Sequence, residues 1–362
     1  MTEAEVIKVL GTVIHPEKQK DLISLNMLKH LMVSGNEVLF TIDLDSPARQ
    51  TRLTVEKDCI EAIKKINGDA NIDIRFSGSI VSTSRANDSV LKGVKNIIAV
   101  VSGKGGVGKS TVSANLALAL ADTGASVGLM DADIYGPSVP IMFGVRGERP
   151  MMREVGGKGM IVPLEKFGIK LISIGLLVDE KSAVAWRGPM VSSAIRQFVT
   201  DVDWGELDYL VIDMPPGTGD IHLTLMQLVP VTGAVVVTTP QDVALADAKK
   251  AVAIFGQHQV KIPIVGLVEN MAYFTPAELP DNKYYIFGKE GGKRLADEFD
   301  LDFLGQIPLV QSIREGGDIG IPAMLNDDAV TKAAFYAFAD EAIKNIDKIN
   351  KGVDKTVNIA HV

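Results

Sequence analysis

Short apolar runs alternate with longer amphipathic segments along most of the chain from residue 95 onward. Seven runs have the length and composition of strands: residues 96–102, 126–133, 169–175, 209–215, 233–240, 262–270 and 302–308. Their apolar residues are consecutive rather than alternating with polar ones, so both faces of each strand should be buried. The pattern predicts an α/β domain with a doubly wound, mostly parallel sheet covered by helices on both faces.

The first 82 residues follow a different pattern. Residues 37–44 and 72–78 alternate apolar and polar side chains like half-buried strands, and residues 54–66 carry apolar side chains at helical spacing. We expect a small α+β domain over residues 1–82. The segment 83–94 is polar and has no periodicity, which is typical of a linker.

The large domain is expected to end in a helix. Residues 328–349 carry apolar side chains at helical spacing, and a polar tail follows over residues 351–362. The predicted organisation is therefore a small domain, a linker, a large domain over residues 95–350 and a tail.

Composition narrows the class of protein. The 362 residues are 46% hydrophobic and 23% charged, with a net charge of −8, so a broad basic surface for nucleic acid is not expected. No apolar run approaches the roughly 20 residues of a membrane span, and the start of the chain lacks the pattern of a secretory signal. With one cysteine, the chain cannot form an internal disulfide. We expect a cytoplasmic protein without nucleic-acid or membrane partners.

A glycine-rich segment lies between the first predicted strand of the large domain and an apolar helix. It reads GKGGVGKST and fits the phosphate-binding pattern G-x-x-x-x-G-K-[ST]. Glycines let the backbone wrap round phosphates, a lysine adds positive charge, and a hydroxyl can bind Mg²⁺. We expect nucleotide contacts from the whole loop: Gly103, Lys104, Gly105, Gly106, Val107, Gly108, Lys109, Ser110 and Thr111.

Carboxylates should complete this site. Asp213 lies at the end of a predicted strand and is expected, with Ser110, to hold Mg²⁺, the carboxylate acting through water. Gly217, four residues later, is expected to contact the γ-phosphate through its backbone. Asp131 and Asp133 lie at the end of another predicted strand, and one of them should position the attacking water. Asp133, nearer the loop, is the preferred candidate, and we expect it to act with Lys104 and Lys109 in catalysis.

Several motifs together carry a family resemblance. The segments KGGVGKST, DADIYGPSVP, WRGPM, DMPPGTGD and VENMAYF resemble those of Mrp/ApbC-type P-loop ATPases. These belong to the group of MinD, ParA and the nitrogenase iron protein, and are known as iron–sulfur cluster carriers. The resemblance implies Mg²⁺-dependent ATP hydrolysis by a homodimer that serves iron–sulfur client or assembly proteins. It also implies that Lys104 reaches the partner subunit's phosphates and that Asn270 binds adenine.

The first domain carries a second resemblance. The stretch from GTVIHPE to TIDL is similar to the small domain that precedes the ATPase in many Mrp proteins and occurs alone in iron–sulfur assembly factors. The family's usual Asp before Pro-Glu is His15 here. Arg49 stands where the family often has a cysteine.

Cluster ligands are not evident in the sequence. Mrp-type carriers usually have a C-x-x-C pair after the segment that corresponds to VENMAYF, whereas residues 270–292 of this chain contain no cysteine. Iron–sulfur clusters normally take four thiolates, and a dimer of this chain offers two. Cys59 lies on the apolar stripe of the helix predicted over 54–66, so we expect a buried, structural thiol. The iron–sulfur ligands are left unassigned.

Two other functions remain open from the sequence. A MinD/ParA-like positioning ATPase would act on a membrane or on DNA, but the tail has few large apolar residues and the net charge is negative. A P-loop enzyme that phosphorylates a small molecule could use residues 140–165 and the WRGPM segment as a substrate pocket.

Overall fold

Two compact units make up the chain, and the first of them ends at residue 80. Each unit is treated by itself. The computed structural model describes residues 2–44, 49–77, 91–177, 188–219, 222, 225–226, 228–255, 262–276, 278–279 and 282–352. Most of the linker predicted at 83–94, most of the tail, and the start of the WRGPM segment lie outside these residues. Our domain boundaries therefore remain predictions.

The first unit is a small sheet covered by helices. Its elements are α1 (Glu3–Leu10), β1 (Leu28–Ser34), β2 (Glu37–Asp43), α2 (Arg49–Lys64) and β3 (Asn71–Ser77). Strand β2 is central, antiparallel to β1 and parallel to β3. The predicted strands and helix are confirmed, while β1 was not predicted. Cys59 of α2 is fully buried in the core of this unit, as expected.

The second unit contains the long series of strands and helices. Its elements are β4 (Val94–Val101), α3 (Lys109–Ala121), β5 (Val127–Asp131), α4 (Val139–Met142), β6 (Met151–Val155), β7 (Lys158–Val162), β8 (Leu164–Lys166), β9 (Ile169–Ser173), η1 (Ile174–Leu176), α5 (Gly188–Thr200), β10 (Leu207–Asp213), β11 (Gly233–Thr238), α7 (Asp242–Phe255), β12 (Ile264–Glu269), α8 (Gly291–Glu298), β13 (Phe303–Gln306), α9 (Gln311–Ile319), η2 (Ala323–Leu325) and α10 (Ala329–Asn350).

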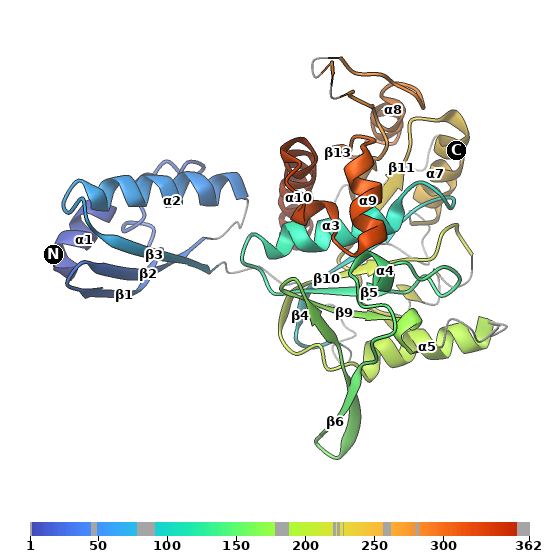
Figure 1. Ribbon diagram of the computed structural model, residues 1–362, viewed down its shortest axis with the longest axis horizontal. Helices are drawn as coiled ribbons and strands as arrows, with labels where there is room; N and C mark the ends of the chain where they lie inside the picture. The colour runs from blue at the N-terminus through green and yellow to red at the C-terminus, as the bar shows by residue number, and fades with distance from the viewer. Residues whose placement is uncertain are drawn as a thin grey trace. The chain divides into compact units, whose positions relative to one another are not determined.

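One large sheet organises this unit. Its strand order is β13-β12-β11-β4-β10-β5-β9-β8, and every neighbouring pair is parallel except β8 with β9. Helices α5, α7 and α8 share a hydrophobic core with the sheet, while α3 and α10 pack against each other and against strands (Figure 1). All seven predicted strands are present, and the predicted doubly wound α/β class is confirmed.

A hairpin of β6 and β7 extends from the body of this unit (Figure 1). Met151 and Met152 of β6 are 74% and 66% exposed, so these two apolar side chains face solvent rather than a core. Lys158 ties the hairpin to the body through a 2.7 Å ion pair with Asp201. Hydropathy did not predict these strands, because apolar side chains on β6 are exposed instead of buried.

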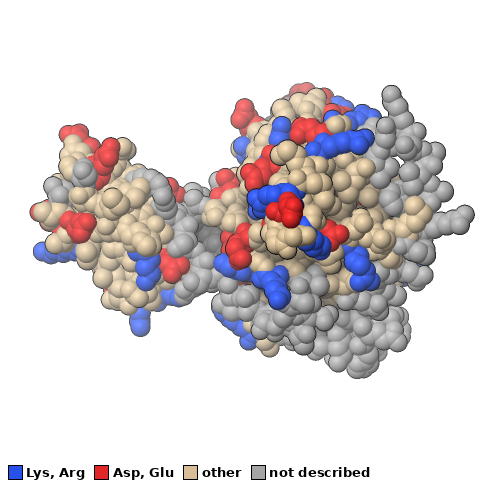
Figure 2. Space-filling view, turned by 90° about the horizontal axis from the view of Figure 1, so that it is seen from below, with Lys and Arg blue, Asp and Glu red and all other residues tan. Residues whose placement is uncertain are grey.

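Charged side chains are mixed on the face of the molecule in Figure 2. Lys and Arg side chains lie between Asp and Glu side chains and do not gather into one basic stripe there. Among the described helices, none is long and apolar enough to span a bilayer.

Candidate functional site

The phosphate-binding loop joins the end of β4 to the first residue of α3. Gly106 and Gly108 have φ angles of 82° and 78°, in the left-handed region that glycine adopts without strain. A Cβ on Gly103 would lie 2.1 Å from the carbonyl oxygen of Asp247, so the loop packs against α7. The glycines thus place the loop's backbone at the N-terminus of α3, where N–H groups favour anions.

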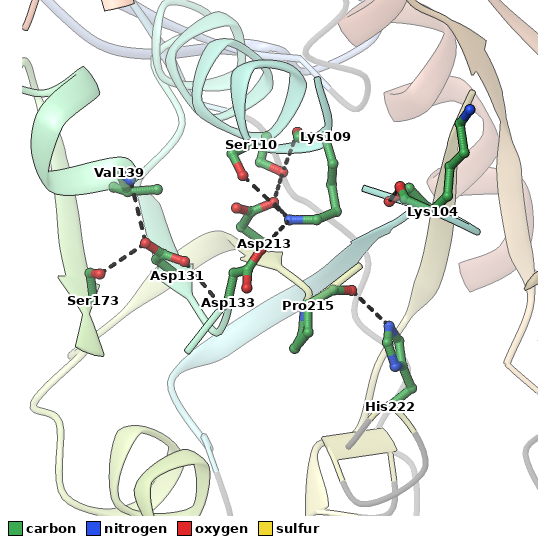
Figure 3. A network of polar contacts seen from close by, with 12 residues as sticks. Lys104, Lys109, Ser110, Asp131, Asp133, Val139, Ser173, Asp213, Pro215 and His222 are labelled. Atoms are coloured by element: carbon green, nitrogen blue, oxygen red, sulfur yellow. Dashed lines mark hydrogen bonds and ion pairs between the residues drawn. The ribbon is translucent and has the colours of Figure 1, made fainter. Parts of the chain in front are cut away.

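Lys109 is the cation at the centre of the site (Figure 3). Its Nζ lies 2.7 Å from Oδ1 of Asp213 and 3.8 Å from Oδ2 of Asp133. Lys109 is 5% exposed and Asp213 is fully buried. Ser113, one helical turn after Lys109, also donates to Oδ1 of Asp213 at 2.7 Å. The structure therefore brings together three of the residues predicted from sequence and adds Ser113, which has no signature of its own.

The groups expected to bind Mg²⁺ suit that ion. The second carboxylate oxygen of Asp213, Oδ2, is buried without a hydrogen-bond partner. The Ser110 hydroxyl lies 3.4 Å from Nζ of Lys109, on the same side of the site. An unpaired carboxylate oxygen and a nearby hydroxyl are hard oxygen ligands of the kind that Mg²⁺ prefers.

Asp131 lies in a row of residues at the carboxyl ends of three adjacent strands. It is in register with Asp213 of β10 on one side and with Ser173 of β9 on the other. The Ser173 hydroxyl donates to Oδ2 of Asp131 at 2.8 Å, and Asp131 is fully buried. Burial, together with the negative charge of Asp213, raises the pKa of Asp131 to about 8.

Asp133 lies in the loop beyond β5. The sequence pattern placed it at the end of that strand, but the strand ends at Asp131, so this detail was wrong. Its Oδ1 is buried without a partner, and burial raises its pKa although Lys109 opposes the shift. An unpaired carboxylate oxygen beside the loop lysine is a suitable acceptor for a hydrogen bond from water.

Two hydrogen bonds hold the segment that follows Asp213. The backbone N–H of Gly217, where a contact to the γ-phosphate was predicted, donates to the carbonyl oxygen of Ser102 at 3.0 Å. Nε2 of His222 lies 2.8 Å from the carbonyl oxygen of Pro215, so this ring nitrogen carries the proton. Burial lowers the pKa of His222 and so favours the neutral ring. Nothing in the sequence pattern around His222 indicates this contact.

Asn270 contacts the phosphate loop directly. Its Nδ2 donates to the carbonyl oxygen of Val107 at 2.8 Å. It also borders a pocket of about 360 Å³ beside the loop, which has both apolar and polar walls. The pocket is lined by residues from the loop, α3, α4, the ends of β12 and β13, and α9: Gly108, Thr111, Ser138, Ile141, Met142, Asn270, Met271, Pro308, Leu309, Val310, Ile313, Arg314, Gly317 and Asp318.

Lys104 differs from Lys109 in its direction. Its side chain extends away from Lys109 and from the three carboxylates (Figure 3). Lys104 is half-buried, whereas Lys109 is buried. The two lysines of the loop therefore face different surroundings, and only Lys109 points into the acidic site of its own chain.

The described residues offer no evident cluster-binding site. Within them, no three His, Cys, Asp or Glu side chains are placed to hold a metal ion. In the segment where the family resemblance predicts paired cysteines that this chain lacks, the backbones of Phe274 and Tyr284 exchange two 2.8 Å hydrogen bonds. Nζ of Lys283 lies 4.0 Å from the ring centre of Tyr273. This loop is thus held by backbone bonds and a cation–π contact rather than by thiolates.

Together these features define a class of protein. A strand of a parallel sheet is followed by a glycine-rich loop and a helix. The helix carries a buried lysine, and carboxylates lie at the ends of neighbouring strands. This arrangement is that of a P-loop NTPase.

Comparison with known proteins gives the family. The profile of the ParA family, described as NUBPL iron-transfer P-loop NTPase, matches residues 93–343. The profile described as iron-sulfur cluster assembly protein matches residues 3–74. The iron-sulfur cluster carrier protein of Synechocystis sp. is 44% identical over 343 residues, covering 94% of this chain and 97% of the relative. The chain belongs to the NUBPL/ParA family of iron-transfer P-loop NTPases.

Solved structures share the fold of the large unit. A nucleotide-binding protein from Archaeoglobus fulgidus in complex with ADP has a TM-score of 0.55 and 39% identity, covering 64% of this chain and 88% of that one. The cell division ATPase MinD of Pyrococcus furiosus has a TM-score of 0.50 and 25% identity, covering 69% and 98%. Both comparisons agree with the P-loop NTPase class.

Proposed function

We propose that the protein is an ATP-hydrolysing factor of iron–sulfur protein maturation that works as a nucleotide-switched homodimer in the cytoplasm. The observation that carries the proposal is Lys109, buried 2.7 Å from Asp213 at the mouth of the phosphate loop. In the proposed site the loop's N–H groups and Lys109 bind the phosphates, and Asp133 accepts a hydrogen bond from the attacking water. Ser110 and Asp213 would hold Mg²⁺, which would supply positive charge beside the phosphates.

The pocket beside Asn270 suits the rest of the nucleotide. It adjoins the loop at Gly108 and Thr111, so a nucleotide with its phosphates on the loop places its base and ribose there. Apolar side chains such as Met271 and Leu309 can pack on the faces of a base. Asn270 supports the loop through Val107 and lines the same pocket.

Lys104 supports the dimer proposal. Because it extends away from its own chain's carboxylates, it is free to reach the phosphates of a facing subunit (Figure 3). A cation supplied by the partner makes hydrolysis depend on dimerisation, since it stabilises charge that develops on the transferring phosphoryl group.

The iron–sulfur role is supported by family membership and by the small first unit. The first unit matches the family of iron-sulfur cluster assembly proteins. The sole cysteine is buried in its core, so the usual thiolate site is not the means of carrying a cluster. We propose that the protein acts on iron–sulfur client or assembly proteins through surfaces other than a C-x-x-C pair.

Two experiments test these proposals. Lys104→Ala should bind ATP but lose hydrolysis, as should Asp133→Asn. Mixing the two variants forms dimers in which one site keeps both groups, so activity recovered on mixing supports a lysine acting in trans. Absence of recovery contradicts a lysine acting in trans.

Anaerobic reconstitution with iron and sulfide tests whether the protein holds an iron–sulfur cluster, with iron and sulfide both counted per dimer. A stoichiometric, transferable cluster would mean that the protein is a carrier with unfamiliar ligands, and would contradict the proposal that it acts through protein surfaces without holding a cluster.

A further inference from the structure

The Asp131 carboxylate organises the loop that carries Asp133. Oδ1 of Asp131 accepts a hydrogen bond from the backbone N–H of Asp133 at 3.1 Å. Oδ2 accepts one from the backbone N–H of Val139 at 3.4 Å. One buried side chain therefore holds both ends of the loop between β5 and α4 (Figure 3).

Ser173 fixes the direction of this carboxylate. It ends β9, is fully buried, and donates its hydroxyl hydrogen to Oδ2 of Asp131 at 2.8 Å. The same hydroxyl oxygen accepts from the backbone N–H of Gly175 at 3.1 Å. With its acceptor side occupied by Gly175, the hydroxyl points its hydrogen at Asp131. The residue at the end of β9 thus determines how the carboxylate on β5 is turned.

The pattern of bonds separates the roles of the two aspartates. Both oxygens of Asp131 already accept hydrogen bonds from the protein, so Asp131 is poorly placed to orient a water molecule. Asp133 retains an unpaired, buried oxygen, and its other oxygen lies 3.8 Å from Nζ of Lys109.

We propose that Ser173 and Asp131 are positioning residues, which hold Asp133 where it orients the attacking water. This inference rests on the proposed ATPase function. Neither residue touches the nucleotide in this scheme. Each acts through the loop between β5 and α4, so strand β9 is coupled to the rate of hydrolysis without contributing a reacting group.

Ser173→Ala tests the proposal, because it removes the hydroxyl with almost no change in volume. A small misplacement of a catalytic group can cost up to about a hundredfold in rate, so we expect kcat to fall by about tenfold or more. The affinity for ATP should stay within about twofold, since the phosphate loop is untouched. Ser173→Thr keeps the hydroxyl and should recover most of the rate. Thr238→Val is the matched control, a buried hydroxyl at the end of β11 that donates to Thr239 rather than to a carboxylate.

Hydrogen exchange gives a readout that does not depend on hydrolysis. In Ser173→Ala the amides of Asp133 and Val139 should exchange faster than in the wild type, and in Thr238→Val they should not. Unchanged exchange in Ser173→Ala overturns the proposal, whatever the hydrolysis rates are.

Asp133→Asn in the same hydrolysis assay separates a failure of the proposed ATPase role of Asp133 from a failure of the positioning role of Ser173. If this variant hydrolyses ATP at the wild-type rate, the proposed role of Asp133 is wrong. If it is inactive while Ser173→Ala keeps the full rate, only the positioning role is wrong.

Discussion

The side-chain amide of Asn270 packs against the phosphate loop at the position where Gly108 leaves room for it. The amide nitrogen lies 2.8 Å from the Val107 carbonyl oxygen, and a Cβ on Gly108 would come within 2.2 Å of the same nitrogen. The end of β12 therefore braces the loop that the nucleotide must contact. Asn270 also lines the pocket beside the loop, so the contact joins that pocket to the phosphate loop.

Asn270→Ala should weaken ATP binding by about tenfold. The loss of a buried hydrogen bond and an unsatisfied Val107 carbonyl cost about 1–2 kcal/mol, and the cost falls on the conformation that binds phosphate. Titration with a fluorescent ATP analogue measures this. Asn345→Ala is the control, because Asn345 also donates a buried amide hydrogen bond, to the Val265 carbonyl oxygen at 2.9 Å. The control should leave the affinity of the folded protein unchanged, and equal affinities for all three proteins contradict the prediction.

Gly103→Ala should destabilise the fold even without nucleotide. The new Cβ would lie 2.1 Å from the Asp247 carbonyl oxygen, and backbone cannot yield as a side chain can. Overpacking of this kind costs about 1–3 kcal/mol. At Gly105 the nearest atom to an added Cβ is 3.9 Å away, on Pro216, so Gly105→Ala should unfold like the wild type. Urea denaturation of the three proteins decides, and similar midpoints for the two variants would contradict the close packing at Gly103.

Lys109→Ala should lower the free energy of unfolding as well as abolish nucleotide binding. It leaves the buried Asp213 without its cation, which costs about 3–5 kcal/mol. Adding Asp213→Asn removes that charge and should restore at least half of the lost stability, though not the activity. Arg314→Ala breaks an exposed pair with Asp318 and should cost about 1 kcal/mol or less. If the double variant is no more stable than Lys109→Ala, the buried charge is not the cause.

The Cys59 thiol should be inert in the folded protein. Burial, with the nearby charges of Asp58 and Glu56, raises its pKa to about 12. At pH 8 only about one molecule in ten thousand then carries the reactive thiolate. Iodoacetamide should label Cys59 rapidly in urea and hardly at all under native conditions, as followed by mass spectrometry. Fast native labelling would show an accessible thiol and reopen its role toward a metal.

Stability should fall on mild acidification, and His222 should account for part of the fall. Burial lowers the pKa of His222 below its ordinary value of 6.5, so the unfolded chain takes up a proton at a higher pH than the folded protein. The contribution of His222 is therefore present above about pH 6.5 and is lost as the pH falls through its folded pKa. His222→Gln retains a donor for Pro215 and cannot titrate. Its free energy of unfolding should decrease less between about pH 7.5 and 5.5, and parallel curves would contradict this.

The sequence predicts the parts of the site whose chemistry requires particular residues at a fixed spacing. The phosphate loop has a fixed spacing, and Asp213 ends a strand whose preceding residues are mostly apolar, so both could be located from the chain alone. Ser113 and Ser173 could not, because a serine in a helix or at a strand end has no distinguishing pattern. Their significance depends on the register of neighbouring strands and on one turn of α3.

The fold shows the same division. Buried strands such as β11 are continuous in hydrophobicity and were predicted. The β6–β7 hairpin carries exposed methionines, and its position is fixed by Lys158 with Asp201 and by backbone pairing. The Lys158–Asp201 pair joins segments far apart in sequence, and hydropathy along the chain does not reveal such a contact.

The backbone bridge between Phe274 and Tyr284 makes the closure of the loop after Asn270 independent of the loop's side chains. Hydrogen bonds between main-chain groups demand no particular side chain, so this loop can exchange cysteines for other residues and still close at the same point. The phosphate loop and its carboxylates need not change with such an exchange. Side chains in this loop can therefore be substituted without loss of the two bonds that close it.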